Sequence, residues 1–158
     1  MFRQRRDHRC GSGQRGLAAV EFAIALAVLM VVMLATAEFA RAFSQYNTLT
    51  KTTRDGVRYL AGRALQGTTG TVEITASLET ETKNLVVYGN AVGAGAPLLE
   101  ALGPDDVDVT GSAANGMVTV SVDYPYQPML GAVLPMFGVG ANQSLAFNLR
   151  STVVMRAL

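Results

Sequence analysis

The first 65 residues carry two kinds of hydrophobic pattern. Residues 17–37 are apolar on every side, and only Glu21 and Thr36 interrupt this run of 21 residues. About 20 such residues span the hydrocarbon core of a bilayer as a helix. The pattern therefore predicts a transmembrane helix over residues 17–37.

Residues 38–65 continue the helix with a one-sided pattern. Apolar side chains recur at steps of three and four residues, which is typical of an amphipathic helix. A continuous helix over residues 17–64 would be about 70 Å long at 1.5 Å per residue, and we expect it to end at Gly67. The stripe can pack on the chain's own C-terminal domain, on other subunits, or on each of them at different turns. Its members are Phe39, Phe43, Tyr46, Leu49, Thr53, Val57, Leu60 and Ala64.

Beyond residue 70 the pattern alternates with a period of two, which predicts strands with one wet face. With the long helix, it indicates an α+β fold: a stalk helix that spans the membrane, followed by a small, mainly antiparallel β-sheet that the stalk covers on one side. Strands are expected over residues 71–78, 107–110, 118–124 and 145–155, the middle two as a hairpin, with a loop over 89–97 and a short helical turn over 98–102.

The distribution of charge orients the helix. The net charge is only +1, yet five of the 13 basic residues lie among the first sixteen positions, beside a single acidic residue. From Leu17 onward acidic residues outnumber basic ones by 11 to 8. By the positive-inside rule, residues 1–16 are a cytoplasmic leader and the C-terminal domain lies across the membrane. The expected parts are this leader, a transmembrane helix (17–37), an amphipathic stalk (38–65) and an exported β-rich domain (66–158).

Composition narrows the chemistry. His8 and Cys10 are the chain's single histidine and cysteine, so the body cannot build a Cys/His zinc site or a Ser-His-Asp or Cys-His nucleophile. The excess of basic over acidic residues is confined to the short arm of residues 1–16, which argues against a nucleic-acid partner. The three aspartates at 105, 106 and 108 lack the spacing of a calcium loop. We expect no metal, no cofactor, no small-molecule substrate and no enzymatic activity.

A processing signal precedes the apolar run. A basic leader is followed by Gly16, then by four mostly apolar residues, and then by Glu21 at the start of the apolar helix. This order resembles the processing site of type IV prepilins, which a membrane-embedded aspartyl peptidase, the prepilin peptidase, cuts after the glycine. The resemblance implies cleavage between Gly16 and Leu17, which would make Glu21 the fifth residue of the mature chain and give it a role in assembly.

The physical chemistry of Glu21 fits that role. An isolated carboxylate in hydrocarbon takes a proton or finds a cation. The new α-amino group of Leu17 on a neighbouring subunit would be such a cation, and the pair would set the register between helices. The competing interpretation is that Glu21, one turn inside the membrane, snorkels to the interface. A ridge of small residues that allows close helix packing lies nearby: Ala19, Ala23 and Ala27.

A wider resemblance rests on three strings in order: residues 16–26, 37–43 (Ala-Glu-Phe-Ala-Arg-Ala-Phe) and 53–59 (Thr-Arg-Asp-Gly-Val-Arg-Tyr). Together they resemble the TadE-like family, small membrane proteins of the Tad/Flp (tight adherence) pilus systems. The resemblance implies a pilin-like fold and a pseudopilin or minor pilin of the inner membrane, with other pilins or pilus-assembly proteins as partners. Leu17, where major type IV pilins have an N-methylated Phe, and the additional domain both point away from the main pilus subunit.

Two other hypotheses stay open. The chain could be an unprocessed single-pass scaffold of the pilus or secretion machinery. It could also be a soluble domain released by signal cleavage after Ala37, because residues 35–37 form an A-x-A site, although the apolar run is longer than a signal core. A cluster in the proline-interrupted segment, which includes Met129, Leu134 and Phe137, is expected to pack in the core, with contact to another pilus component as the alternative.

Overall fold

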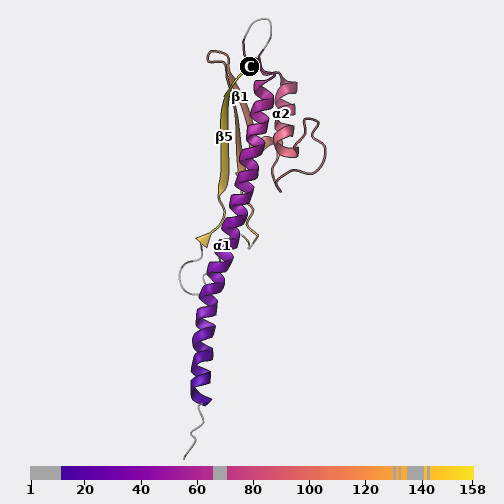
Figure 1. The fold of residues 1–158 in the computed structure, drawn as a ribbon. Coiled ribbons are helices and arrows are strands. Elements are labelled where there is room, and N and C mark those ends of the chain that lie inside the picture. The colour runs from indigo at the N-terminus through magenta and orange to yellow at the C-terminus, as the bar shows by residue number, and fades with distance from the viewer. Residues whose placement is uncertain (1–11, 66–70, 130, 132, 135–140, 142) are drawn as a thin grey trace, which may run out of the picture.

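The computed structural model describes residues 12–65, 71–129, 131, 133–134, 141 and 143–158. One helix, α1 (Ser12–Ala61, 50 residues), runs the length of the molecule. Its N-terminal half stands clear of the rest, and its C-terminal half lies along a small sheet (Figure 1). The predicted long helix is confirmed, but it begins inside the expected leader and ends before Gly67. The rest of the leader, residues 1–11, lies outside the described residues.

The helix ends early because the chain turns into a new pairing. The Ala64 carbonyl accepts a hydrogen bond from the Glu73 N–H (2.9 Å), and Leu65 forms an isolated antiparallel bridge with Val72. Residues 66–70, which join these partners, are outside the described residues. After α1 the chain therefore reverses direction, and residues 72–73 pair with residues 64–65.

The sheet has three antiparallel strands in the order β1-β2-β5. The predicted hairpin is confirmed, with Val109 opposite Val120 in the register. The predicted last strand is confirmed on the other side of β2, where Val153 also lies opposite Val120. The α+β fold expected from the sequence is therefore the observed one. The strands are β1 (Val107–Ser112), β2 (Met117–Pro125) and β5 (Asn148–Arg156), and a separate two-stranded ladder joins β3 (Val133–Leu134) and β4 (Gln143–Ser144).

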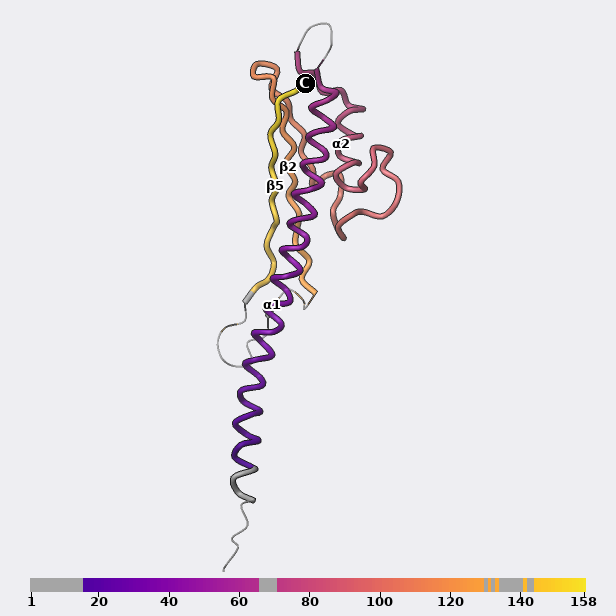
Figure 2. The backbone as a smooth tube through the Cα atoms, viewed as in Figure 1, coloured from indigo at the N-terminus to yellow at the C-terminus, as the bar shows by residue number. Residues whose placement is uncertain are grey.

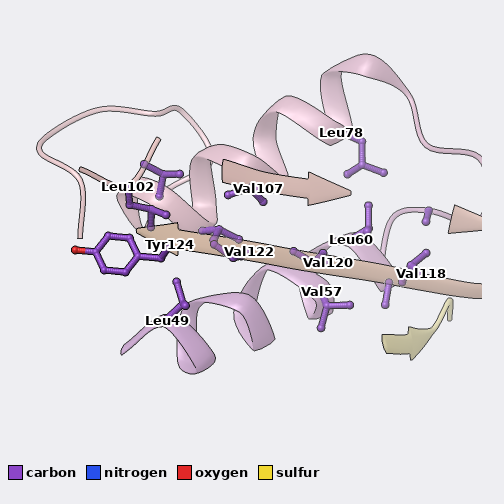
Figure 3. Packing of buried hydrophobic residues seen from close by; sticks show 14 of the residues in the cluster. Leu49, Val57, Leu60, Leu78, Leu102, Val107, Val118, Val120, Val122 and Tyr124 are labelled. Carbon is purple, nitrogen blue, oxygen red and sulfur yellow. The ribbon is translucent and has the colours of Figure 1, made fainter. Parts of the chain in front are cut away.

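The core lies between α1 and one face of β2, as Figure 3 shows. Alternate side chains of β2 are buried, which is the pattern of a strand with one covered face. From α1, Leu49, Val57 and Leu60 meet this face and are fully buried. Burial of each such side chain contributes about 1.5–3 kcal/mol, so the contact fixes the helix on the sheet. The buried β2 residues are Val118, Val120, Val122 and Tyr124.

The strand predicted over residues 71–78 is wrong, because Val72 forms only an isolated bridge and a second helix begins at residue 76. This helix, α2 (Ala76–Tyr88), packs on α1 and β1. Thr75 caps its start, since its hydroxyl oxygen accepts a hydrogen bond from the Leu78 N–H (3.3 Å). Gly89 caps its end with φ +75°, a left-handed conformation that glycine adopts without steric cost.

Two periodicities overlap in this segment, which explains the wrong prediction. Leu78, Thr82 and Val86 are buried at a helical spacing of four residues. Leu78 also completes the two-residue alternation that starts at Val72. Residues 89–97 form the expected loop, and the Leu102 N–H closes a turn on the Leu99 carbonyl (3.2 Å), just before a short 3₁₀ helix at Pro104–Asp106.

The amphipathic stripe divides at the middle of the stalk. Its second half, from Leu49 to Ala64, is buried in the chain's own domain. Phe39, Phe43 and Tyr46 are instead 77, 66 and 40% exposed. Helix α2 lies along only the upper part of α1 (Figure 1), so it does not cover these three aromatic side chains.

Gly56 allows the two helices to approach closely. A Cβ atom at this position would lie 2.5 Å from Val86 Cγ2. Val86 is fully buried and β-branched, so it has little freedom to move away. The glycine that weakens α1 as a helix is therefore required by the packing of α2.

We predict that Gly56→Ala lowers the free energy of unfolding by about 1–3 kcal/mol, the usual cost of overpacking, although alanine favours a helix by about 1 kcal/mol. Urea unfolding of the detergent-solubilised chain, followed by circular dichroism, measures this. Gly62→Ala is the matched control, because its Cβ would meet nothing closer than the Arg58 carbonyl at 3.6 Å. A G56A chain as stable as the parent would contradict the packing argument.

Candidate functional site

From Gly16 to Met30 every residue of α1 is exposed, and Val31, Leu34 and Ala35 are partly covered. No side chain from Gly16 to Ala37 is buried, although the segment is strongly apolar. This helix is long and apolar enough to cross a membrane, and its exposure distinguishes it from the core helix of a soluble domain. The segment is therefore consistent with a membrane protein that has one apolar helix near its N-terminus.

The predicted processing residues lie on this exposed helix. Gly16 and Leu17 are both within α1, and Leu17 is 73% exposed. A Cβ atom built on Gly16 would have no described atom within 4 Å. Packing within the described chain therefore gives no reason for a glycine at this position, in contrast to Gly56.

Glu21 lies one turn further along the same helix. It is exposed, and its carboxylate has no hydrogen-bond or salt-bridge partner among the described residues. Ala19, Ala23 and Ala27 are exposed around it. The structure thus places all the predicted site residues on one exposed stretch of α1, and none of them is buried against the described part of the folded domain.

A second carboxylate, Glu38, forms a site that sequence analysis missed. Glu38 is the first buried residue of α1, with 6% of its surface exposed. The Tyr126 hydroxyl donates a hydrogen bond to Glu38 Oε2 (2.5 Å) and also lies 3.3 Å from the Glu38 carbonyl oxygen. Tyr126 follows the end of β2 and stacks on Phe147, with ring centroids 4.9 Å apart. This hydrogen bond ties the end of β2 to α1, and Figure 2 shows the backbone of that end of the sheet beside the helix.

The same junction contains an apolar groove. Its volume is about 210 Å³, and it opens where the free half of α1 meets the folded domain. The groove joins the exposed helix to the sheet, because its walls come from both. Its lining residues are Ala35, Glu38, Phe39, Ala42, Tyr126, Leu145 and Phe147.

Burial and the hydrogen bond to Glu38 raise the pKa of Tyr126 to about 12. In an unfolded chain a tyrosine pKa is about 10. As the pH rises from about 10 to 12, the unfolded chain loses this proton while the folded chain keeps it. The stabilising contribution of Tyr126 is therefore complete below pH 10 and is lost toward pH 12.

We predict that Tyr126→Phe lowers the free energy of unfolding by about 1–3 kcal/mol at neutral pH, because the buried Glu38 carboxylate loses the hydrogen bond from the Tyr126 hydroxyl. The fall in stability above pH 10 should also become shallower. Urea unfolding at a series of pH values measures both effects. Tyr46→Phe, at an exposed position on the same helix face as Phe43, is the control, and equal behaviour of the two variants would contradict the role of the junction.

Comparison with known proteins identifies the helix that carries these residues. A family model described as TadE-like protein matches residues 16–58. No curated protein and no solved structure matches the chain. The matched segment begins at Gly16 and contains Glu21, Glu38 and Gly56. Residues 16–58 therefore match the TadE-like family, the family that the resemblance of these same residues implied.

Proposed function

We propose that the chain is a pseudopilin or minor pilin that takes part in assembly of a Tad-type pilus. It is inserted in the inner membrane with its N-terminus in the cytoplasm and its folded domain outside. The prepilin peptidase cuts between Gly16 and Leu17. The role is structural, without enzymatic activity, and the partners are other pilins or pilus-assembly proteins.

The observation that carries the proposal is the unsatisfied carboxylate of Glu21 on an exposed apolar helix. A charge in hydrocarbon is costly and usually functional. The described residues of the folded domain, which begins 17 residues further on at Glu38, offer it no partner. A cation from another subunit therefore suits it, and the α-amino group that cleavage creates at Leu17 is such a cation. The exposed alanines beside it allow a second helix to approach closely.

Two alternatives predict different mature chains. An unprocessed scaffold would keep residues 1–16. Signal cleavage after Ala37 would begin the chain at Glu38, inside an unbroken helix and at a buried junction. The continuity of α1 through residue 37 favours an anchor that stays attached.

The first prediction concerns the mature N-terminus. Mass spectrometry of the protein from its native host should find a chain that starts at Leu17. Gly16→Val should abolish this processing without a loss of folding, because Gly16 has no packing role. A start at Met1 would support the unprocessed scaffold, and a start at Glu38 would refute the membrane-anchored minor pilin.

The second prediction concerns Glu21. Glu21→Leu should leave membrane insertion intact, because it makes the helix more apolar, but it should reduce assembly. A loss of about 1.4 kcal/mol per subunit contact weakens that contact about tenfold. The readout is the amount of sheared surface pili relative to membrane-bound protein. Thr36→Leu is the matched control, since it removes the other polar side chain of the apolar run, whose hydroxyl already donates to the Val32 carbonyl (2.8 Å).

A further inference from the structure

We propose that the lower end of the folded domain, formed by Phe39, Phe43, Leu145 and Phe147, sits in the lipid headgroup layer at the outer surface of the membrane. We call these four residues the apolar rim. The inference rests on the membrane anchor of the proposed function. It adds a lipid-binding surface on the exported domain, outside the transmembrane helix.

The length of the helix places the rim at this depth. Residues 17–37 cover about 31 Å at 1.5 Å per residue, which is the thickness of a hydrocarbon core of about 30 Å. Phe39 and Phe43 then lie about 3 and 9 Å beyond the core along the helix axis. Headgroup layers add about 5–8 Å on each side, so both exposed rings fall in or at the edge of that layer.

The contact between Tyr126 and Glu38 brings the end of the sheet to the same depth as Phe39. Tyr126 is bonded to Glu38 and stacked on Phe147. Leu145 and Phe147 line the same groove as Ala35, a residue of the expected transmembrane segment. The end of the sheet therefore lies beside the boundary of the membrane, with Phe147 45% exposed.

The segment of sequence that contains Leu145 and Phe147 is free of charge, whereas the helix side of this end carries Glu38 and Arg41. No acidic or basic residue occurs between Asp123 and Arg150, although 16% of the whole chain is charged. Charge resumes on both sides at the same place, where the Arg150 guanidinium is hydrogen-bonded to the Asp123 carboxylate. A segment without charges suits an apolar interface, because it contains no ion that lipid contact would strip of water.

The helix continues without a break from the apolar segment into the folded domain. Helix α1 contains no proline, and no glycine lies between Gly16 and Gly56, so it has neither of the usual causes of a kink near residue 37. The rim is thus continuous with the surface that lipid already covers. For this reason we assign it to lipid, and contact with a partner protein is the alternative that the experiment tests.

The chain contains no tryptophan, so single tryptophans can report depth. The full chain is reconstituted in phosphatidylcholine vesicles that carry bromine at a shallow or a deep acyl position. Phe147→Trp and Leu145→Trp report on the rim. Val28→Trp, in the middle of the span, and Leu158→Trp, exposed at the far end of the domain beside Ala61, are the controls.

We expect F147W and L145W to lose more fluorescence to shallow than to deep bromine, V28W to show the reverse, and L158W to be unaffected. Unquenched rim tryptophans together with a quenched V28W would overturn the inference and leave the anchor intact, which would point to a protein partner at the rim. An unquenched V28W would overturn both the inference and the proposed membrane insertion. Circular dichroism of each variant confirms that the comparison is between folded chains.

Discussion

One unbroken helix must satisfy two different environments, and the rest of the structure depends on this constraint. From Gly16 to Ala37 the helix is apolar on all sides and exposed, which suits lipid. From Glu38 onward only one side is buried, because water takes the place of lipid and the sheet covers a single face. Leu49, Val57 and Leu60 hold that face on β2. Since α1 is continuous through the two parts, the place where the sheet packs on α1 sets its distance along the helix from the apolar segment.

The elements that sequence predicted well are those with one clear period. The all-round apolar run, the hairpin and the last strand each follow a single pattern, and each is found within a few residues of its expected bounds. Helix α2 was missed because its buried residues begin where a two-residue alternation ends, at Leu78. The local signals that resolve the ambiguity are its caps, Thr75 and Gly89. Because α2 was not predicted, the stalk positions that it covers could not be deduced either. In the sequence pattern, Phe39 and Phe43 therefore appeared equivalent to the buried stripe residues from Leu49 to Ala64.

Of the two carboxylates of the candidate site, Glu21 could be predicted from the sequence and Glu38 could not. Glu21 is conspicuous because a carboxylate in an apolar run is rare whatever the fold. Glu38 gives no such signal, since a charge after a membrane helix is ordinary. Its partner, Tyr126, lies 88 residues away in the sequence, and only the packing of β2 on α1 brings the two together. Contacts of that separation depend on tertiary structure, so no local pattern could have indicated this one.

Glu21 and Glu38 on α1 differ in whether the described part of the subunit itself supplies a hydrogen-bond partner for the carboxylate. They are 17 residues apart on one rigid helix, or about 25 Å. Glu38 is buried and receives a hydrogen bond from its own domain, so it stabilises the subunit as an isolated unit. Glu21 receives none from the described chain and lies where water is excluded if the helix spans a membrane. A polar group left unsatisfied in the isolated subunit stabilises any complex that satisfies it, by the amount it costs the subunit alone. In the proposed assembly, Glu21 therefore contributes free energy to the contact between subunits, while Glu38 contributes to the stability of the subunit itself.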